Sequence, residues 1–251
     1  LLNGSNASFY GLEFDDGRAF QQIASDGGLL EHPVELTHLK LAPGERAEIV
    51  VDLSGGKPAR LVSVARGVNT GGMGMGMMMR GVQDAEFPFL EIRPAATLSA
   101  SPDLPAKLAD VPPATANGAV RTRPFILEMG GMGMGMMMGG GFTINGAAMD
   151  MAVVNNVVAK DTLEVWEISN AGPMSHPFHV HNTQFRILSR AGRPPAASEA
   201  GYKDTVLVTP GEVVRIAIKF QHYADPQRPY MYHCHILEHE DAGMMGQFVV
   251  V

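Results

Sequence analysis

Cysteine is almost absent from this 251-residue sequence, which contains one, Cys234, and so forms no internal disulfide. Cystine content therefore gives no information about the cellular compartment. The sequence also lacks any run of about 20 apolar residues, the length that a transmembrane helix needs. Basic residues are also few. The sequence has 19 Lys and Arg and 26 Asp and Glu, which give a net charge of −7. This balance argues against a nucleic-acid-binding surface.

No secretory signal peptide is present at the start of the sequence, and the first residue is not Met. The opening residues, Leu1 to Gly4, have the pattern of a strand end that enters a turn. A domain rarely begins at such a point. We therefore expect a sequence that starts inside a domain.

Glycine and proline are abundant, with 29 and 17 residues, and they separate short segments of alternating apolar residues. Residues 161–168 alternate in this way, and residues 125–129, 142–146 and 185–188 are shorter apolar segments of the same kind. Alternation bounded by Gly and Pro turns is typical of strands in antiparallel sandwiches. The sequence therefore predicts an all-β fold built from Greek-key β-sandwiches.

An internal repeat divides the chain into two similar parts. Residues 23–28 resemble residues 187–192, and residues 41–52 resemble residues 208–219, in the same order and with nearly the same spacing. Both members of the second pair contain a Pro-Gly turn followed by a strand-like alternation. We therefore expect two copies of one β-rich unit in tandem.

The expected units are residues 1–97 and residues 123–251, joined by a Pro- and Ala-rich linker at residues 98–122 that should be semi-rigid. The second unit carries the histidine motifs described below. In their place the first unit has residues 6–10 and 63–66, which contain no histidine or cysteine. The first unit is therefore expected to have the scaffold without metal ligands.

The single cysteine lies near the C-terminal end in the most informative stretch of the sequence. His233 and His235 flank Cys234, and His239 and Met244 follow it. One thiolate, two imidazoles and a weak axial thioether are what a blue copper centre uses. On a strand, His233 and His235 would point to the face opposite Cys234. Cys234 would then face one metal while its neighbours face another, and a few covalent bonds would join the two sites.

A second histidine cluster lies upstream, where His176, His179 and His181 fall within six residues. His179 and His181 would share one face of a strand, and His176 is separated from them by Pro177. An isolated histidine is most often an ordinary core or surface residue. Here the two clusters hold six of the nine histidines, beside the only cysteine. This density favours a metal site over ordinary histidines.

The two motifs, HPFHVH at residues 176–181 and HCHILEHEDAGM at residues 233–244, resemble the C-terminal copper motifs of the multicopper oxidases. Within that family the sequence is most similar to the bacterial copper-efflux (cuprous) oxidases. The resemblance implies cupredoxin domains, and it covers the second domain, without its first strands, and the third. By motif position it implies type 1 copper ligands at His176, Cys234, His239 and Met244, a type 2 ligand at His179, and type 3 ligands at His181, His233 and His235.

The resemblance also implies an oxidase reaction. Cu(I) or a phenolic reductant would give up electrons at the type 1 copper, and a trinuclear copper cluster would reduce O2 to water. Glu240, next to His239, would relay protons, with Asp241 as a second nearby carboxylate; the alternative for Glu240 is an ordinary salt-bridged surface residue. A periplasmic location and a role in copper homeostasis follow from the family alone.

The trinuclear cluster of the family takes eight histidines, of which this chain offers four. No His-x-His motif lies before residue 176. We therefore expect a partner, an N-terminal cupredoxin domain that supplies four further histidines. The alternative is a non-enzymatic copper-binding or electron-transfer module with only a type 1 site and Met-rich Cu(I)-binding loops. The complete set of four cluster histidines in this chain favours the enzyme.

Two methionine runs of identical sequence occur at residues 72–79 and 131–138. Thioethers favour Cu(I), whereas the alternative is a flexible apolar loop, because Met is also a general filler of gaps. Beside a blue copper motif we favour Cu(I) binding. In the copper-efflux oxidases part of the substrate site is acidic, but here Gly172 and Pro173 occupy that place. The candidate Cu(I) ligands are Met132, Met134, Met136 and Met174.

Overall fold

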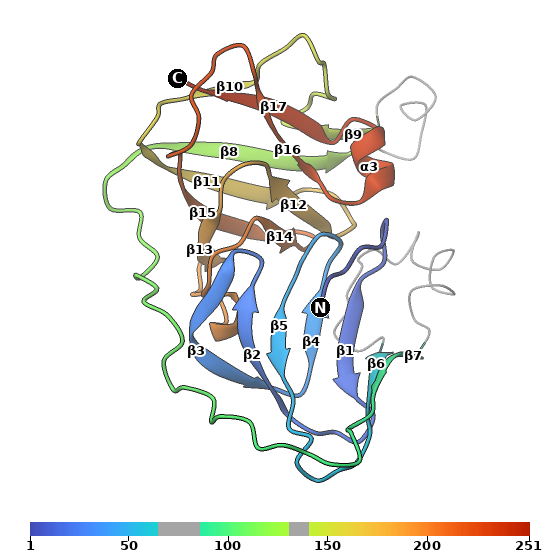
Figure 1. The fold of residues 1–251 in the computed structure, drawn as a ribbon. Coiled ribbons are helices and arrows are strands. Elements are labelled where there is room, and N and C mark those ends of the chain that lie inside the picture. The colour runs from blue at the N-terminus through green and yellow to red at the C-terminus, as the bar shows by residue number, and fades with distance from the viewer. Residues whose placement is uncertain (65–85, 131–140) are drawn as a thin grey trace.

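The structure is a computed structural model, and it describes residues 1–64, 86–130 and 141–251. Two β-rich units follow one another along the chain, and Figure 1 shows the first in blue below the second. The first unit contains strands β1 (Tyr10–Phe14), β2 (Phe20–Ser25), β3 (Gly28–Leu36), β4 (Leu39–Leu41), β5 (Glu48–Val50), β6 (Ala59–Val64) and β7 (Phe87–Ile92).

The second unit adds one short α-helix and a turn of 3-10 helix, η1 (Ala197–Glu199), to its strands. The strands are β8 (Ala119–Met129), β9 (Phe142–Ile144), β10 (Asn156–Val158), β11 (Leu163–Asn170), β12 (His176–Val180), β13 (Phe185–Arg190), β14 (Thr205–Val208), β15 (Val213–Lys219), β16 (Tyr230–Cys234) and β17 (Met245–Val250). The α-helix is α3 (Leu237–Asp241), between β16 and β17. The all-β prediction is confirmed.

The sheet orders show how the repeat is built. In the first unit one sheet has the order β4-β1-β6-β7, and in the second unit the matching sheet has the order β14-β12-β16-β17, extended by β10. The other sheets are β3-β2-β5 and β13-β15-β11-β8-β9. The pairs β2–β5 and β13–β15 correspond, and both come from the segments whose sequences resemble each other. Within the described residues the first unit has no strands that match β8, β9 and β11.

Strand register identifies the residues of the first unit that replace the candidate ligands. Leu12 lies opposite Ser63 between β1 and β6, as Phe178 lies opposite Cys234 between β12 and β16. Because Leu12 and Phe178 both point into a core, Ser63 corresponds to Cys234. Ser63 lies in the segment, residues 63–66, that the sequence places where the second unit has its cysteine motif. A serine cannot replace the soft thiolate of a blue copper site.

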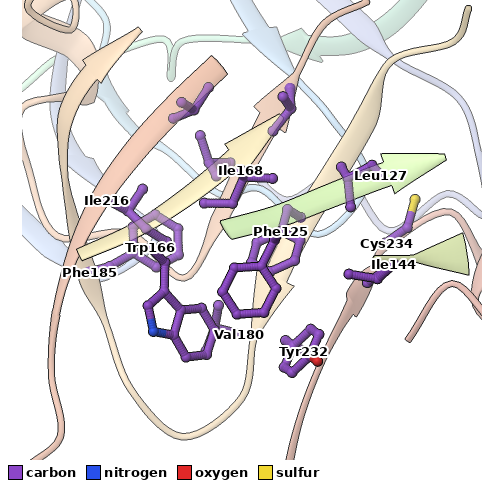
Figure 2. Packing of buried hydrophobic residues seen from close by; sticks show 14 of the residues in the cluster. Phe125, Leu127, Ile144, Trp166, Ile168, Val180, Phe185, Ile216, Tyr232 and Cys234 are labelled. Carbon is purple, nitrogen blue, oxygen red and sulfur yellow. The ribbon is translucent and has the colours of Figure 1, made fainter. Parts of the chain in front are cut away.

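The core of the second unit lies between its two sheets and ends at the cysteine. Trp166 and Phe125 are fully buried, with ring centroids 4.5 Å apart, and Tyr232 packs edge-on against both. Each large apolar side chain that is buried here contributes about 1.5–3 kcal/mol to folding. Figure 2 shows the sulfur of Cys234 at one end of this cluster, beside Leu127 and Ile144. The site therefore lies at the end of a fully buried aromatic core.

The segment between the units crosses both of them along one side, where it is coloured green in Figure 1. The backbone N–H of Leu108 donates to the carbonyl of Glu31 in the first unit. In the second unit, Arg186 donates to the carbonyl of Pro112. Strand β8 begins at Ala119, inside the range expected to be linker, because it pairs in parallel with β11 from Ala119 to Leu127.

Glutamate 164 anchors strand β8 to strand β11 through a buried ion pair with Arg123. We expect Glu164→Gln to lower the free energy of unfolding by about 3–5 kcal/mol, because it leaves the buried guanidinium without a counter-charge. Urea denaturation of the two proteins measures the difference. The matched control is Glu167→Gln on the same strand, whose exposed pair with Arg215 is worth about 1 kcal/mol or less. Equal effects of the two substitutions would contradict the claim that the buried Arg123–Glu164 pair anchors β8 to β11.

Candidate metal centres

Strands β12 and β16 and helix α3 bring three candidate ligands together. Cys234 ends β16, His176 begins the neighbouring β12, and His239 lies on α3, which follows directly. The Cys234 Sγ lies 3.5 Å from Nδ1 of His176 and 3.6 Å from Nδ1 of His239, and these two nitrogens are 3.1 Å apart. All three residues are buried. Two imidazole nitrogens and one sulfur therefore converge on a single point.

The chemistry of this group fits a copper ion. A soft sulfur with two imidazole nitrogens is the trigonal donor set of blue copper sites. The pKa of His176 is lowered to about 3 and that of His239 to about 4, in both cases chiefly by burial. Both rings are thus neutral and able to bind a metal at neutral pH. Burial raises the pKa of the Cys234 thiol, so a metal that binds here must displace the thiol proton.

Methionine 244 and Met174, the thioether candidates of this site, lie close to it along the chain. The carbonyl of Met244 accepts a hydrogen bond from the backbone N–H of Cys234, and the side chain is fully buried. Met174 lies in the turn before β12, where its carbonyl accepts a hydrogen bond from Asn170. Gly172, in the same turn, lies against the His176 ring, and a methyl group there would come 3.6 Å from Nε2. Met132, Met134 and Met136 lie outside the described residues.

A second group of histidines forms on the other face of β12 and β16. His179 lies directly opposite His233 in the strand register, and Nε2 of His181 lies 3.0 Å from Nε2 of His233. The ring of His235 follows the end of β16, with its centroid 5.6 Å from those of His179 and His233. One nitrogen from each of His179, His181 and His233 falls within a common 4.8 Å. Four rings are therefore gathered where the alternation of the motif places them.

Hydrogen bonds orient two of these rings with Nε2 toward the group. Nδ1 of His233 lies 3.0 Å from the carbonyl of Cys234 and 3.1 Å from Oε2 of Glu240. Nδ1 of His179 lies 3.0 Å from the carbonyl of Asp204. Because a carbonyl only accepts, both Nδ1 atoms carry the proton and both Nε2 atoms present a lone pair. A metal-binding histidine is held in this way by its other nitrogen, so the residues present fit a metal ion.

Burial keeps this cluster uncharged at neutral pH. The pKa of His233 is lowered to about 3, mainly by burial, and the pKa of His181 is lowered for the same reason. Glu240 lies beside the cluster and half-buried, and burial raises its pKa. Asp241 ends helix α3 on the exposed side, and its negative charge raises the pKa of Glu240 further. A carboxyl that holds its proton more readily thus lies next to His233.

Several residues at the site were not predicted from the sequence. The ring of Phe142 stacks on that of His239, with centroids 4.0 Å apart. Asp204 and Thr205 hydrogen bond to His179, and Arg46 of the first unit binds Asp204. These residues are of common types and no spacing links them, because the two members of the Arg46–Asp204 pair are 158 positions apart. Nothing in the sequence alone could have revealed them.

Comparison with known proteins gives the family. The profile described as multicopper oxidase matches residues 122–251, more than half of the chain. The chain belongs to the multicopper oxidase family. Proteins of this family bind copper, and the group of His176, Cys234 and His239 is consistent with a type 1 copper site. None of the helices in the described part of the chain is long and apolar enough to cross a membrane.

Similar proteins cover the whole chain but are longer. Multicopper oxidase mco of Staphylococcus haemolyticus is 34% identical over 254 residues, which include 100% of this chain and 47% of that protein. Cell division protein FtsP of Yersinia pestis is also 34% identical, over 100% of this chain and 50% of its own length. The structure of the laccase-like multicopper oxidase CueO from Ochrobactrum sp. superposes with a TM-score of 0.84 and 31% identity, over 100% of this chain and 54% of that one. The chain spans about half the length of the curated relatives it matches.

Proposed function

We propose that this chain is the part of a multicopper oxidase that carries the electron-entry site and half of the oxygen-reducing cluster. The observation that carries the proposal is the pair of histidine groups on opposite faces of β12 and β16. Cys234 belongs to one group, and the adjacent His233 belongs to the other. Copper at the two sites, when bound, supplies one-electron transfer from a reductant and four-electron reduction of dioxygen to water.

The proposed ligand roles follow the family motifs, and the contacts in the structure support them. The convergence of two Nδ1 atoms and Sγ supports the type 1 assignment, and the gathered Nε2 atoms support the cluster. Met244 is proposed as the weak axial ligand because the hydrogen bond from Cys234 holds its backbone at the site. The proposed set is type 1, His176, Cys234, His239 and Met244; type 2, His179; and type 3, His181, His233 and His235.

The backbone between the two groups is the proposed electron path. Cys234 is bonded through one peptide unit to His233 and through another to His235. A hydrogen bond of 3.0 Å between Nδ1 of His233 and the carbonyl of Cys234 adds a shorter connection. Both connections lie in a region that is buried and hydrogen bonded. They therefore hold the two groups at a fixed separation.

The proposed proton donor is Glu240. Its Oε2 lies 3.1 Å from Nδ1 of His233, and burial favours its protonated form. Asp241 is the proposed outer carboxylate, because it is exposed and adjacent to Glu240 along the chain. Asp241 at the surface and Glu240 beside His233 are therefore the proposed acidic groups along which protons reach the cluster. The four further histidines that the family's cluster takes are proposed to come from an N-terminal cupredoxin domain, and the protein to act in the bacterial periplasm in copper homeostasis.

Oxygen uptake tests the proposed function. The full-length protein, which includes the proposed N-terminal domain, is purified, loaded with copper and supplied with Cu(I) or with a phenol in an oxygen electrode. The proposal predicts catalytic uptake of one O2 for every four electrons, with no hydrogen peroxide left in solution. Absence of uptake in a blue protein would contradict the oxidase and would favour the second candidate, an electron-transfer module. Sequence similarity does not distinguish the oxidase from the electron-transfer module. A multicopper oxidase and the cell division protein FtsP are both 34% identical to this chain over its whole length.

The methionine run at residues 131–138 is proposed to bind substrate Cu(I), in part through Met132, Met134 and Met136. We expect replacement of these three by leucine to lower kcat/KM for Cu(I) about tenfold or more, which corresponds to about 1.4 kcal/mol. Oxidation of a phenol should change much less, because leucine keeps the apolar character and removes only the thioethers. Steady-state assays with both substrates give the comparison. An equal loss on both would count against a cuprous role.

A further inference from the structure

We propose that Arg46, in the first unit, is a positioning residue for the histidine cluster of the second unit. The inference rests on the proposed function, in which His179 and His235 bind copper. Arg46 touches neither ring. It holds in place two groups that do, the carboxylate of Asp204 and the turn at Gly44.

The first connection runs from Arg46 to His179 through Asp204 and Thr205. The guanidinium donates two parallel hydrogen bonds to the Asp204 carboxylate, at 2.6 and 2.7 Å. The hydroxyl of Thr205 donates to the same carboxylate at 3.0 Å, so its oxygen is left to accept from Nδ1 of His179, also at 3.0 Å. The Asp204 carbonyl is the second acceptor for that nitrogen. The anchored carboxylate fixes the donor direction of the Thr205 hydroxyl, and the carbonyl can only accept. Both acceptors therefore favour a His179 ring that presents Nε2.

The second connection runs from Arg46 to His235 through Gly44. Arg46 donates to the carbonyl of Gly44 at 3.0 Å. Gly44 has a positive φ of 83°, and a side-chain carbon at this position would lie only 2.5 Å from the His235 ring. The backbone of the first unit therefore approaches this ring more closely than any residue with a side chain would permit. One guanidinium thus holds the groups next to two rings of the cluster, those of His179 and His235.

Buried charges hold Arg46 itself in place. Asp26 accepts from the backbone N–H of Arg46 and, through its own carbonyl, from the guanidinium. Lys203, which is buried, bonds to Asp26 at 2.9 Å and to Glu45 at 3.3 Å. A buried charged network of this kind often adds no more stability than apolar packing would. The network therefore fits a role in fixing geometry between the two units.

Arginine suits this role because its planar fork offers five donors in fixed directions. Four hydrogen bonds from the two terminal nitrogens are used here, to Asp204, Gly44 and Asp26. Lysine has one nitrogen and cannot place parallel bonds on the carboxylate while it also reaches both carbonyls. Removal of the guanidinium should release the Asp204 carboxylate, and with it the acceptor role of Thr205 toward His179.

The test compares Arg46→Met with Arg190→Met. Arg190 also binds two carboxylates, Glu199 and Glu212, and lines the same cavity of about 340 Å³ between the units. None of its hydrogen bonds in the described structure reaches a histidine. It controls for the general effect of losing an arginine at this interface. Thermal unfolding of each variant confirms that it is folded before the comparison is made.

Two readouts follow the positioning role directly. Nitrogen-15 NMR of the histidine rings in the copper-free protein should show a single Nδ1-protonated form for His179 in the parent and in Arg190→Met, and a mixture of tautomers in Arg46→Met. Copper affinity of the histidine cluster should fall about 10–100-fold in Arg46→Met, as is typical when an outer partner of a metal ligand is lost. The blue absorption from the Cys234 site should be retained in both. Arg46→Lys should lie between the parent and Arg46→Met.

An unchanged His179 tautomer and cluster affinity in Arg46→Met would overturn the inference, as would an equal loss in Arg190→Met. Failure of the proposed function has a different signature, because the parent protein itself would then bind no copper at the histidine cluster. In that case the tautomer of His179 still decides whether Arg46 positions the ring. If Arg46→Met does not fold, Arg46→Lys supplies both readouts.

Discussion

Replacement of Cys234 by serine is expected to remove the blue colour of the copper-loaded protein and at least about 10³-fold of its oxidase activity, or about 4 kcal/mol of barrier. The thiolate is the soft ligand on which a blue copper site depends, and a hydroxyl does not replace it. Cys234 is also the residue that connects the two groups, through its peptide bonds to His233 and His235. No other cysteine is present in the chain to take its place.

The fold is expected to survive this substitution. Cys234 is fully buried at the end of the aromatic core, so a serine hydroxyl without a partner costs about 1–3 kcal/mol. Cys234→Ala is the matched control, because it removes the sulfur and adds no buried hydroxyl. Visible absorption, copper content and oxygen uptake are measured for both variants. A blue band that persists in either one would contradict the assignment of Cys234 as the type 1 thiolate.

Replacement of Glu240 by glutamine is expected to slow oxygen reduction about 10²–10⁴-fold, the usual contribution of a positioned general acid. The amide keeps the shape of the side chain and its place beside His233, but it carries no transferable proton. Stopped-flow reoxidation of the reduced protein by O2 measures this step. Anaerobic bleaching of the blue band by a reductant measures the electron-entry step, which should be unchanged.

Asp241→Asn is the control for Glu240→Gln, since it removes a neighbouring carboxylate that is exposed and acts on Glu240 through its charge. We expect a much smaller change in the same step. If Glu240→Gln reoxidises at the rate of the parent protein, Glu240 is only a structural partner of His233. If both variants slow the step equally, the loss of negative charge, and not of a proton donor, is responsible.

The candidate ligands were predictable because their information is local. Six of the histidines and the cysteine fall in two short motifs, and a strand places alternate residues on opposite faces. This is why His233 and Cys234, although adjacent, lie in different groups. The repeat was predictable for a similar reason, since the Pro-Gly turn recurs with the same local contact. Glu45 accepts from the N–H of Ala42 as Glu212 accepts from that of Thr209.

Interactions between distant segments were not predictable. Strand β8 begins before the predicted one because Arg123 is buried against Glu164, 41 residues later, and no periodicity shows a buried arginine. The sequence gives only the segment 63–66 as the counterpart of the cysteine motif, because the exact residue depends on strand register, which the pairing of β1 with β6 reveals. Arg46 and Asp204 meet only because the two units pack together. In each case the determining contact joins residues that have no relation in sequence.

The most direct test of the central claim, that one chain holds two copper sites back to back on β12 and β16, is anomalous X-ray diffraction at the copper edge from crystals of the copper-loaded protein. We expect one peak among Sγ of Cys234 and the Nδ1 atoms of His176 and His239, and separate density at the Nε2 atoms of His179, His181 and His233. Density at only the first position would leave electron transfer as the function. Absence of density beside Cys234 would show that the chain holds no type 1 copper site.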